Sequence, residues 1–486
     1  MDSRRRRHAI VIGGGIAGLC AARALAGHFE RVTVLERDTV PDETELRVGV
    51  LQGRHAHLLA ARGRDELEGL FPGFEAGLRA RGCVRLDLGE DIARLRRSGW
   101  APPEPSGLVA FSASRVAIER TLRALVLEDP NVAFIERACV SGLVRDGQRV
   151  SGVRLRGAPA HLPAELAADL VVDASGRSSL AVQWLEDLGA DTPADARVEA
   201  CGHHATRWFE APSPSALGRE WWWRGMFVEP RPQTGLPGVT VLPVEDDRWI
   251  VTLSGLEDAL APQDEGAFGA ALRRLPTRIV AAALARAKPL SPIFSQRAQP
   301  SRLRAFERAR GLPGGFVAIG DAVCALGPAQ GQGIAVAAIG ASLLASLLAR
   351  SRAKLGAADP AFARAFFRAQ ARLLRGQFAF AASTSVFGGL CGGVAEGASA
   401  WLRAVDAAAT KDRHVRRVLA RVQHWQAEPS ALRWPEVASR VAAHAVRCAS
   451  QRALDGALHG ASATGAAVGR VGRAGRAALA GLRFGA

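Results

Sequence analysis

Short apolar runs that lead into glycine-rich turns recur along the first two thirds of the chain. Residues 9–12 and 31–36 have the pattern of buried parallel strands, and a helix-like stretch lies between them. The runs at 168–173 and 315–321 repeat this pattern, and each finishes at an aspartate in a glycine-containing loop. The pattern therefore predicts a parallel sheet with polar, glycine-rich loops at its strand ends.

Other segments show helical spacing or hairpin signals. Apolar residues at helical spacing predict an amphipathic helix over 115–128, which ends before Pro130. Asp146-Gly147 is a hairpin turn signal, and the runs around it predict an antiparallel meander. The meander comprises 132–135, 140–144 and 150–155; strands are also predicted at 239–244 and 249–253, short strands and loops over 82–114, and a helix over 56–70.

The last third of the chain is helical in pattern and rich in alanine and arginine from about residue 351. From about residue 455 it becomes low in complexity, which predicts disorder. The stretch 334–349 comes nearest to the length and apolarity of a membrane span, but its glycine and serine favour a buried helix. No transmembrane segment is expected.

Composition narrows the class of protein. The net charge of +16 comes almost entirely from arginines spread along the chain, which has three lysines and no tyrosine, so we expect a composition bias and no nucleic-acid partner. The seven cysteines are far apart, odd in number and without a C-x-x-C pair. This pattern predicts a reducing cytoplasm and no metal site.

The first glycine-rich turn has the residues of a dinucleotide site. Gly13 permits the tight turn, Gly15 lets the backbone approach a pyrophosphate, and Gly18 lets the helix pack closely on the strand. Glu36 ends the next predicted strand, where a carboxylate would meet ribose hydroxyls. The strand before Gly13, the helix after it and the acidic Glu36 are all features of a dinucleotide-binding segment, so the sequence predicts nucleotide binding here.

Two later strand-end loops extend this prediction to a flavin laid across the sheet edge. Asp321 is placed to accept hydrogen bonds from ribityl hydroxyls, and Pro328 would stiffen the loop that follows. Gly331 and Gly333 open a helix whose N–H groups would stabilise negative charge on the reduced ring.

These elements together resemble the FAD-dependent monooxygenases of the para-hydroxybenzoate hydroxylase type. The likeness rests on the first turn with Glu36, on Asp173-Ala-Ser-Gly176-Arg-Ser, and on Gly320-Asp321 with the following glycines, and it covers residues 8 to 350 in order. Residues 52–57 (Gln-Gly-Arg-His-Ala-His) resemble a loop of the branch of bacterial polyether epoxidases and, more distantly, of squalene epoxidase.

The resemblance implies a site and a domain plan. The residues expected to bind FAD are Gly13, Gly15, Gly18, Glu36, Arg37, Arg54, Arg115, Asp173, Gly176, Asp321, Pro328, Gly331 and Gly333. The expected fold is mixed α/β (α+β), with a Rossmann-like FAD-binding domain interleaved with a smaller β-sheet substrate domain. The FAD domain comprises 1–85, 113–188 and 301–350; the substrate domain comprises 189–300 with strands from 86–112; a helical region follows over 351–454 and a tail over 455–486.

The resemblance also implies a reaction. Reduced flavin would form a C4a-hydroperoxide with O₂ and pass one oxygen atom to an apolar small molecule, by hydroxylation or epoxidation. Electrons would come from transient NAD(P)H docking, which Arg177 could assist, or from a separate flavin reductase. No catalytic side chain can be named. A reductase of prenyl-type double bonds and a degenerate flavin-binding homologue, suggested by the altered residues around Cys324, remain alternatives.

Several further residues have two interpretations. His55 and His57 belong either to a loop beside the flavin or to ordinary packing, and Trp221-Trp222-Trp223 either lines a substrate pocket or covers a sheet. The pair His203-His204 is interpreted as structural. Halogenation is disfavoured, because no lysine precedes Lys288 and a W-x-W-x-I-P pattern is absent.

Overall fold

The computed structural model describes residues 6–40, 49–157, 162–200, 202–213, 221–231, 234–257, 261–327, 331–350, 356–384 and 396–460. The chain divides into two compact units. The first contains residues 1–94 and 103–393, and the second contains 95–102 and 394–486. The mixed α/β fold class predicted from the sequence is confirmed.

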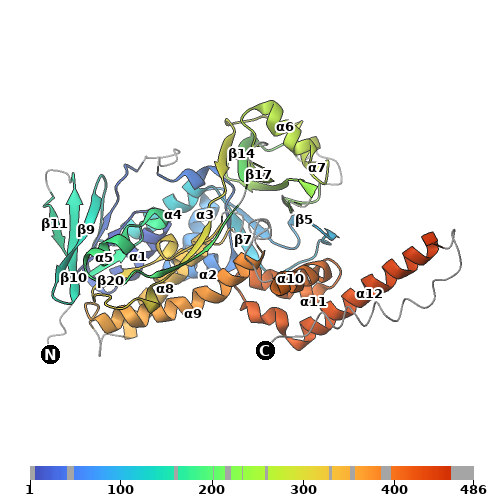
Figure 1. Cartoon of the computed structure of the whole chain (residues 1–486). Coiled ribbons are helices and arrows are strands. Elements are labelled where there is room, and N and C mark those ends of the chain that lie inside the picture. The colour runs from blue at the N-terminus through green and yellow to red at the C-terminus, as the bar shows by residue number, and fades with distance from the viewer. Residues whose placement is uncertain are drawn as a thin grey trace. The chain divides into compact units, whose positions relative to one another are not determined.

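A parallel five-stranded sheet forms the centre of the first unit (Figure 1). Its interior strands are almost wholly apolar and buried, which is the pattern of a parallel sheet covered on both faces. The order is β20-β12-β1-β2-β8, with β1 at Arg6–Ile12, β2 at Phe29–Leu35, β8 at Val132–Ile135, β12 at Leu170–Asp173 and β20 at Phe316–Ala318.

The edge strand β8 corrects the predicted meander. Val132–Ile135 pairs in parallel with β2, so it belongs to the central sheet. Only β9 (Cys139–Asp146) and β10 (Arg149–Arg156) form the expected hairpin, with β11 (Glu165–Ala167) completing a separate three-stranded sheet. A short apolar run does not reveal its partner, because pairing is decided by tertiary contacts.

The helices cover the central sheet and set the path of the strand-end loops. α8 (Gly333–Arg350) packs against α1 (Ile16–Ala26) and α2 (Ala61–Leu70), and α9 (Pro360–Thr384) packs on α8. The helix predicted from residue 56 begins only at Ala61, because Leu58–Leu59 pairs as strand β3. The other helices of this unit are α3 at Phe74–Ala80, α4 at Arg115–Leu127, α5 at Ala181–Asp187, α6 at Glu265–Arg273 and α7 at Ile279–Leu284.

Within the described part of the chain, α8 alone has the length and apolarity that a membrane crossing requires. More than half of it is buried inside the protein, as expected for a core helix.

A seven-stranded sheet has the order β18-β14-β17-β16-β15-β5-β6, in which β6 and the end of β5 belong to the second unit. Its strands are β18 at Phe294–Arg297, β14 at His203–Glu210, β17 at Arg248–Leu256, β16 at Gly238–Val244, β15 at Gly225–Val228, β5 at Ile92–Arg96 and β6 at Gly99–Trp100. Two small sheets complete the first unit, β3-β7-β4 with β7 at Val109–Ser112 and β4 at Val84–Asp87, and β13-β19-β21 with β13 at Ala194–Val198, β19 at Ser301–Ala305 and β21 at Cys324–Ala325.

The second unit consists mainly of α10 (Glu396–Ala409), α11 (Arg413–Gln423) and α12 (Pro435–Gly460). α11 is strongly amphipathic, with Val415, Val418, Leu419 and Val422 buried and its arginines on the other face. Within the same unit, Arg96 and Asp406 form an ion pair. The predicted tail is outside the described residues from 461 onward, and the domain boundaries stay predictions.

We predict that Gly18→Ala strongly destabilises the protein. A Cβ atom at Gly18 would overlap the carbonyl oxygen of Gly13, so α1 would have to move away from the first turn. We expect a loss of about 3 kcal/mol or more in the free energy of unfolding, measured by urea denaturation. Gly27→Ala is the matched control, because Gly27 has a helical conformation with open space beside it, and its effect should stay below about 1 kcal/mol. Equal losses in both variants would contradict this packing.

Candidate functional site

Three loops distant in the sequence meet at the carboxyl edge of the central sheet. Ile12 pairs with Asp173, and Asp173 pairs with Ala318, so the ends of β1, β12 and β20 lie side by side. A Cβ atom at Gly13 would lie 2.8 Å from the carbonyl oxygen of Ala174, and one at Gly320 would lie 2.8 Å from Cβ of Ala17. We call these loops, with Gly331–Gly333, the strand-end site.

The N-terminus of α1 faces this edge without a side-chain cap. Its N-cap is Gly15, and its first turn contains no acidic residue. The first N–H groups of a helix lack intrahelical partners and carry a partial positive charge. Gly13 has a φ of 97°, a conformation that suits glycine and turns the chain sharply from β1 into α1. This combination fits an anionic phosphate group.

Glu36 follows β2 directly and is almost fully buried. Its Oε2 accepts a hydrogen bond from the N–H of Gly14 at 2.7 Å, and its Oε1 accepts one from the N–H of Asp38 at 3.0 Å. Each carboxylate oxygen can accept a second hydrogen bond. Glu36 therefore holds the first turn in place, and contact of its carboxylate with a ribose hydroxyl stays a prediction.

Asp173 points into its own loop. The side chain is fully buried, with Oδ1 accepting from the N–H and the hydroxyl of Ser175, and Oδ2 accepting from the hydroxyl of Ser179 at 2.5 Å. Asp173 thus shapes the turn that leads to Gly176, whose φ of 82° again favours glycine. Direct contact of either residue with FAD stays a prediction.

Asp321 is enclosed by protein and still accessible. Burial raises the pKa of its carboxyl group, while the positive charges of Arg177, Arg115 and Arg302 act in the opposite direction. The side chain nevertheless keeps 22% of its surface exposed. An enclosed carboxylate that contacts solvent can accept hydrogen bonds from a ligand that replaces that solvent.

Arg177 ties the second loop to the third. Its Nε lies 3.7 Å from Oδ2 of Asp321, and its guanidinium donates to the backbone carbonyls of Pro300, at 2.7 Å, and of Leu326. Burial lowers the pKa of Arg177, and Asp321 partly offsets this effect. The sequence singled out Arg177 only as an aid to NAD(P)H docking, because nothing along the chain indicates these carbonyl partners.

The remaining predicted residues have different surroundings. Arg115 opens α4 and donates from Nε to Glu119 at 2.6 Å, with 12% of its side chain exposed. Gly333 opens α8, as predicted, and its Cβ position lies 3.7 Å from Oδ1 of Asp321. Arg37 is mostly exposed beside Asp38, and Arg54 is exposed over the ring of Phe294. Pro328 lies outside the described residues.

The profile of the family described as FAD dependent oxidoreductase matches residues 8–347. The chain belongs to this family. A protein of Mycobacterium tuberculosis named Rv3254 is 34% identical to this oxidoreductase over 365 residues, which is 72% of this chain and 74% of the relative.

Solved flavoproteins share the fold of the oxidoreductase. Para-nitrophenol 4-monooxygenase PnpA of Pseudomonas putida superimposes with a TM-score of 0.60 at 17% identity, covering 85% of this chain and 96% of its own. The flavin-dependent brominase Bmp2 gives 0.59 at 15%, with 86% and 93% covered. PqsL of Pseudomonas aeruginosa, in complex with 2-aminobenzoylacetate, gives 0.56 at 19%, with 79% and 99% covered. At these identities the likeness shows the fold alone.

The tryptophan run of the oxidoreductase mainly covers its seven-stranded sheet. Trp223 is buried, with ring centroids 4.9 Å from Trp221 and 5.9 Å from Trp249 of β17. Trp222 is exposed. The structure thus describes packing by this cluster, and a substrate pocket lined by it stays a prediction.

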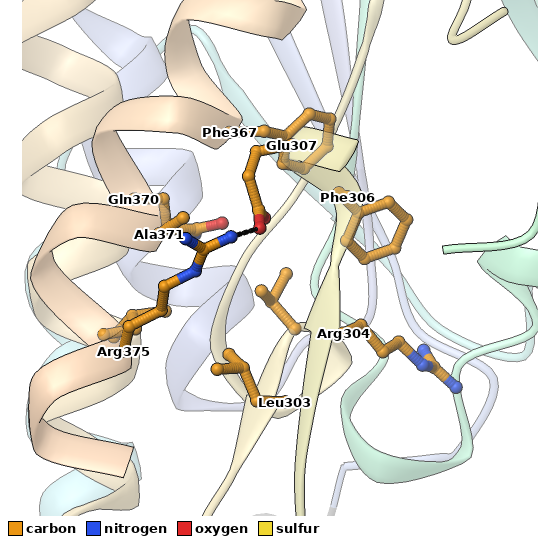
Figure 2. Close-up of a pocket in the computed structure, with 10 residues that line it drawn as sticks. Leu303, Arg304, Phe306, Glu307, Phe367, Gln370, Ala371 and Arg375 are labelled. Atoms are coloured by element: carbon orange, nitrogen blue, oxygen red, sulfur yellow. Dashed lines mark hydrogen bonds and ion pairs between the residues drawn. The ribbon is translucent and has the colours of Figure 1, made fainter. Parts of the chain in front are cut away.

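A small recess between β19 and α9 is too small for a substrate (Figure 2). Its volume of about 10 Å³ leaves room for about one water molecule. Glu307 and Arg375 form an ion pair beside it. Arg304, which also lines it, donates to the carbonyl oxygens of Ala322 at 2.9 Å and Ser179 at 3.2 Å. Arg304 therefore ties β19 to the loops that follow β12 and β20.

Metal-ligating side chains do not gather anywhere within the described residues. The five cysteines described there are free thiols, of which Cys20, Cys83 and Cys324 are buried. Burial raises the pKa of Cys324 well above its usual value, so the thiol stays protonated.

We predict that His204 makes the stability of the protein depend on pH. Burial lowers its pKa from 6.5 to about 4, so the unfolded chain binds a proton between these values that the folded chain does not. Stability contributed by neutral His204 is therefore complete above about pH 6.5 and falls as the pH approaches 4. Between about pH 7.5 and about pH 5, the wild type should lose about 2 kcal/mol more than His204→Leu in urea unfolding. Identical losses would show that His204 does not titrate in this way.

Proposed function

We propose that this FAD-dependent oxidoreductase is a monooxygenase that inserts one oxygen atom into an apolar small molecule, by hydroxylation or epoxidation. One observation carries the proposal: three strand ends meet in register around Asp321, which is enclosed yet accessible. The balanced reaction takes substrate, O₂, NAD(P)H and a proton, and gives oxygenated substrate, water and NAD(P)⁺. Bound FAD supplies the redox chemistry and the activation of O₂.

The residues present fit FAD. The uncapped N-terminus of α1 would hold the pyrophosphate, and Glu36 would accept from the ribose. Asp321 would accept from ribityl hydroxyls, and the N-terminus of α8 at Gly333 would face the pyrimidine edge of the flavin ring. We assign Asp173 and Gly176 to shaping the second loop.

Other side chains would orient these contacts. Arg177 joins Asp321 to the loops at Pro300 and Leu326, so it would hold the carboxylate in position. Electrons would come from NAD(P)H or from a separate reductase. Docking of NAD(P)H on Arg177 would require the guanidinium to exchange its carbonyl partners for phosphate oxygens.

Finer assignments are part of the same proposal. The loop Gln52–His57, which resembles that of the polyether epoxidase branch, supports epoxidation as the specific reaction. The free thiols among the described cysteines support a reducing, cytoplasmic location.

The proposal is tested by following flavin and oxygen together. Purified protein should be yellow and should hold FAD. Anaerobic NAD(P)H, or a flavin reductase, should bleach it, and O₂ should then release hydrogen peroxide or add one oxygen atom to candidate alkenes and phenols, detected by mass. Alkene reduction that is indifferent to O₂ would instead indicate a prenyl-type reductase. Protein that cannot take up FAD would be a degenerate homologue.

We predict that Asp321→Ala weakens FAD binding far more than His204→Ala. Hydrogen bonds to a charged acceptor contribute about 1.5–3 kcal/mol, so the FAD dissociation constant should rise about 10- to 100-fold. The measurement is flavin fluorescence titration of apoprotein. Equal effects of the two variants would remove Asp321 from the cofactor site.

A further inference from the structure

The loop that contains His55 and His57 is fastened to the seven-stranded sheet by His55. Nδ1 of His55 lies 2.7 Å from the Thr206 hydroxyl, and Nε2 lies 2.8 Å from Oε1 of Gln296. The Thr206 and Thr252 hydroxyls are 2.7 Å apart, and the N–H of Ala56 donates to Oγ1 of Thr252 at 3.3 Å.

These contacts have one consistent direction. The amide oxygen of Gln296 only accepts, so Nε2 of His55 donates to it and Nδ1 accepts from Thr206. Both ring nitrogens of His55 are therefore used within the protein. His55 acts as a positioning residue for the loop, with no nitrogen left for a ligand.

His57 differs from His55 in this respect. Its Nδ1 lies 2.8 Å from the backbone carbonyl of His55 and must donate, because a carbonyl only accepts. Burial and the positive charge of Arg115 lower the pKa of His57 to about 4, so the ring is neutral. Nε2 then carries a lone pair, and no hydrogen bond to it occurs among the described residues. The side chain is only half-buried, so this acceptor is not sealed off.

His57 lies beside the strand-end site. The carbonyl oxygen of its neighbour Leu58 is 3.6 Å from the Cβ position of Gly331, in the loop that leads into α8. Arg115 interacts electrostatically with both His57 and Asp321. The loop of His57 lies beside Gly331 and the turn of Asp321 lies beside Gly333, so both are close to the N-terminus of α8.

We propose that Nε2 of His57 accepts a hydrogen bond from a hydroxyl group of the ribityl chain of bound FAD, as a second acceptor beside Asp321. This inference rests on the proposed function. The ribityl chain of FAD carries several hydroxyl groups, which can donate hydrogen bonds to more than one acceptor. Neutral His57 would add an acceptor beside Asp321 without changing the net charge there. Because Nδ1 of His57 donates its proton to the His55 carbonyl, the lone pair of Nε2 stays available.

The test compares His57→Gln and His57→Phe. Glutamine keeps an acceptor oxygen, whereas phenylalanine keeps only the ring. The FAD dissociation constant of His57→Phe should rise about 5- to 10-fold, as expected for the loss of one hydrogen bond, and that of His57→Gln should stay within about 3-fold of the wild type. The melting temperatures of both apoproteins should match that of the wild type. His204→Phe is the matched control, because the imidazole of His204 likewise has a pKa of about 4.

The outcomes separate this inference from the proposed function. If the wild type binds FAD and His57→Phe binds it equally well, His57 is not a cofactor ligand. If both His57 variants lose affinity together with apoprotein melting temperature, His57 serves packing, and the inference is overturned. A wild type that takes up no FAD overturns both the inference and the proposed function.

Discussion

Parallel pairing of β1, β12 and β20 is the constraint on which the rest of this molecule depends. Parallel strands end at the same edge of a sheet, so hydrogen bonding in register brings Ile12, Asp173 and Ala318 together across more than 300 residues of chain. Glycines at the loop starts then permit contacts that a Cβ atom would block. Backbone groups of the three loops therefore line the carboxyl edge of the central sheet, together with the side chains of Asp173 and Asp321.

Charge is balanced locally around that edge. The chain is strongly basic, yet the arginines near this edge have partners. Arg177 forms an ion pair with Asp321 and donates to the backbone carbonyl of Pro300, and Arg115 donates to Glu119. Desolvation alone would favour a protonated Asp321, and the surrounding arginines oppose this. The arginines near the site therefore act mainly on the shape and protonation of the loops.

The second sheet is joined to this site through hydrogen bonds. The series of hydrogen bonds from Ala56 through Thr252 and Thr206 to His55 joins the loop at residues 52–57 to β14 and β17, and every member is satisfied. Buried polar networks of this kind fix a relative position more sharply than apolar packing does, because a displaced partner leaves a buried group unpaired. The loop at residues 52–57 and the seven-stranded sheet are held in one arrangement as a result.

The sequence by itself determined the elements whose signals are local. The turn at Gly13–Gly18, the strand that precedes Glu36 and the helix opening at Gly333 follow from spacing and glycine chemistry, which act within a few residues. Tertiary structure decided the rest. It assigned Val132–Ile135 to the central sheet, turned Asp173 into its own loop and gave Arg177 its carbonyl partners. Strand partners and side-chain directions depend on residues far away in the chain, and a linear pattern carries no record of them.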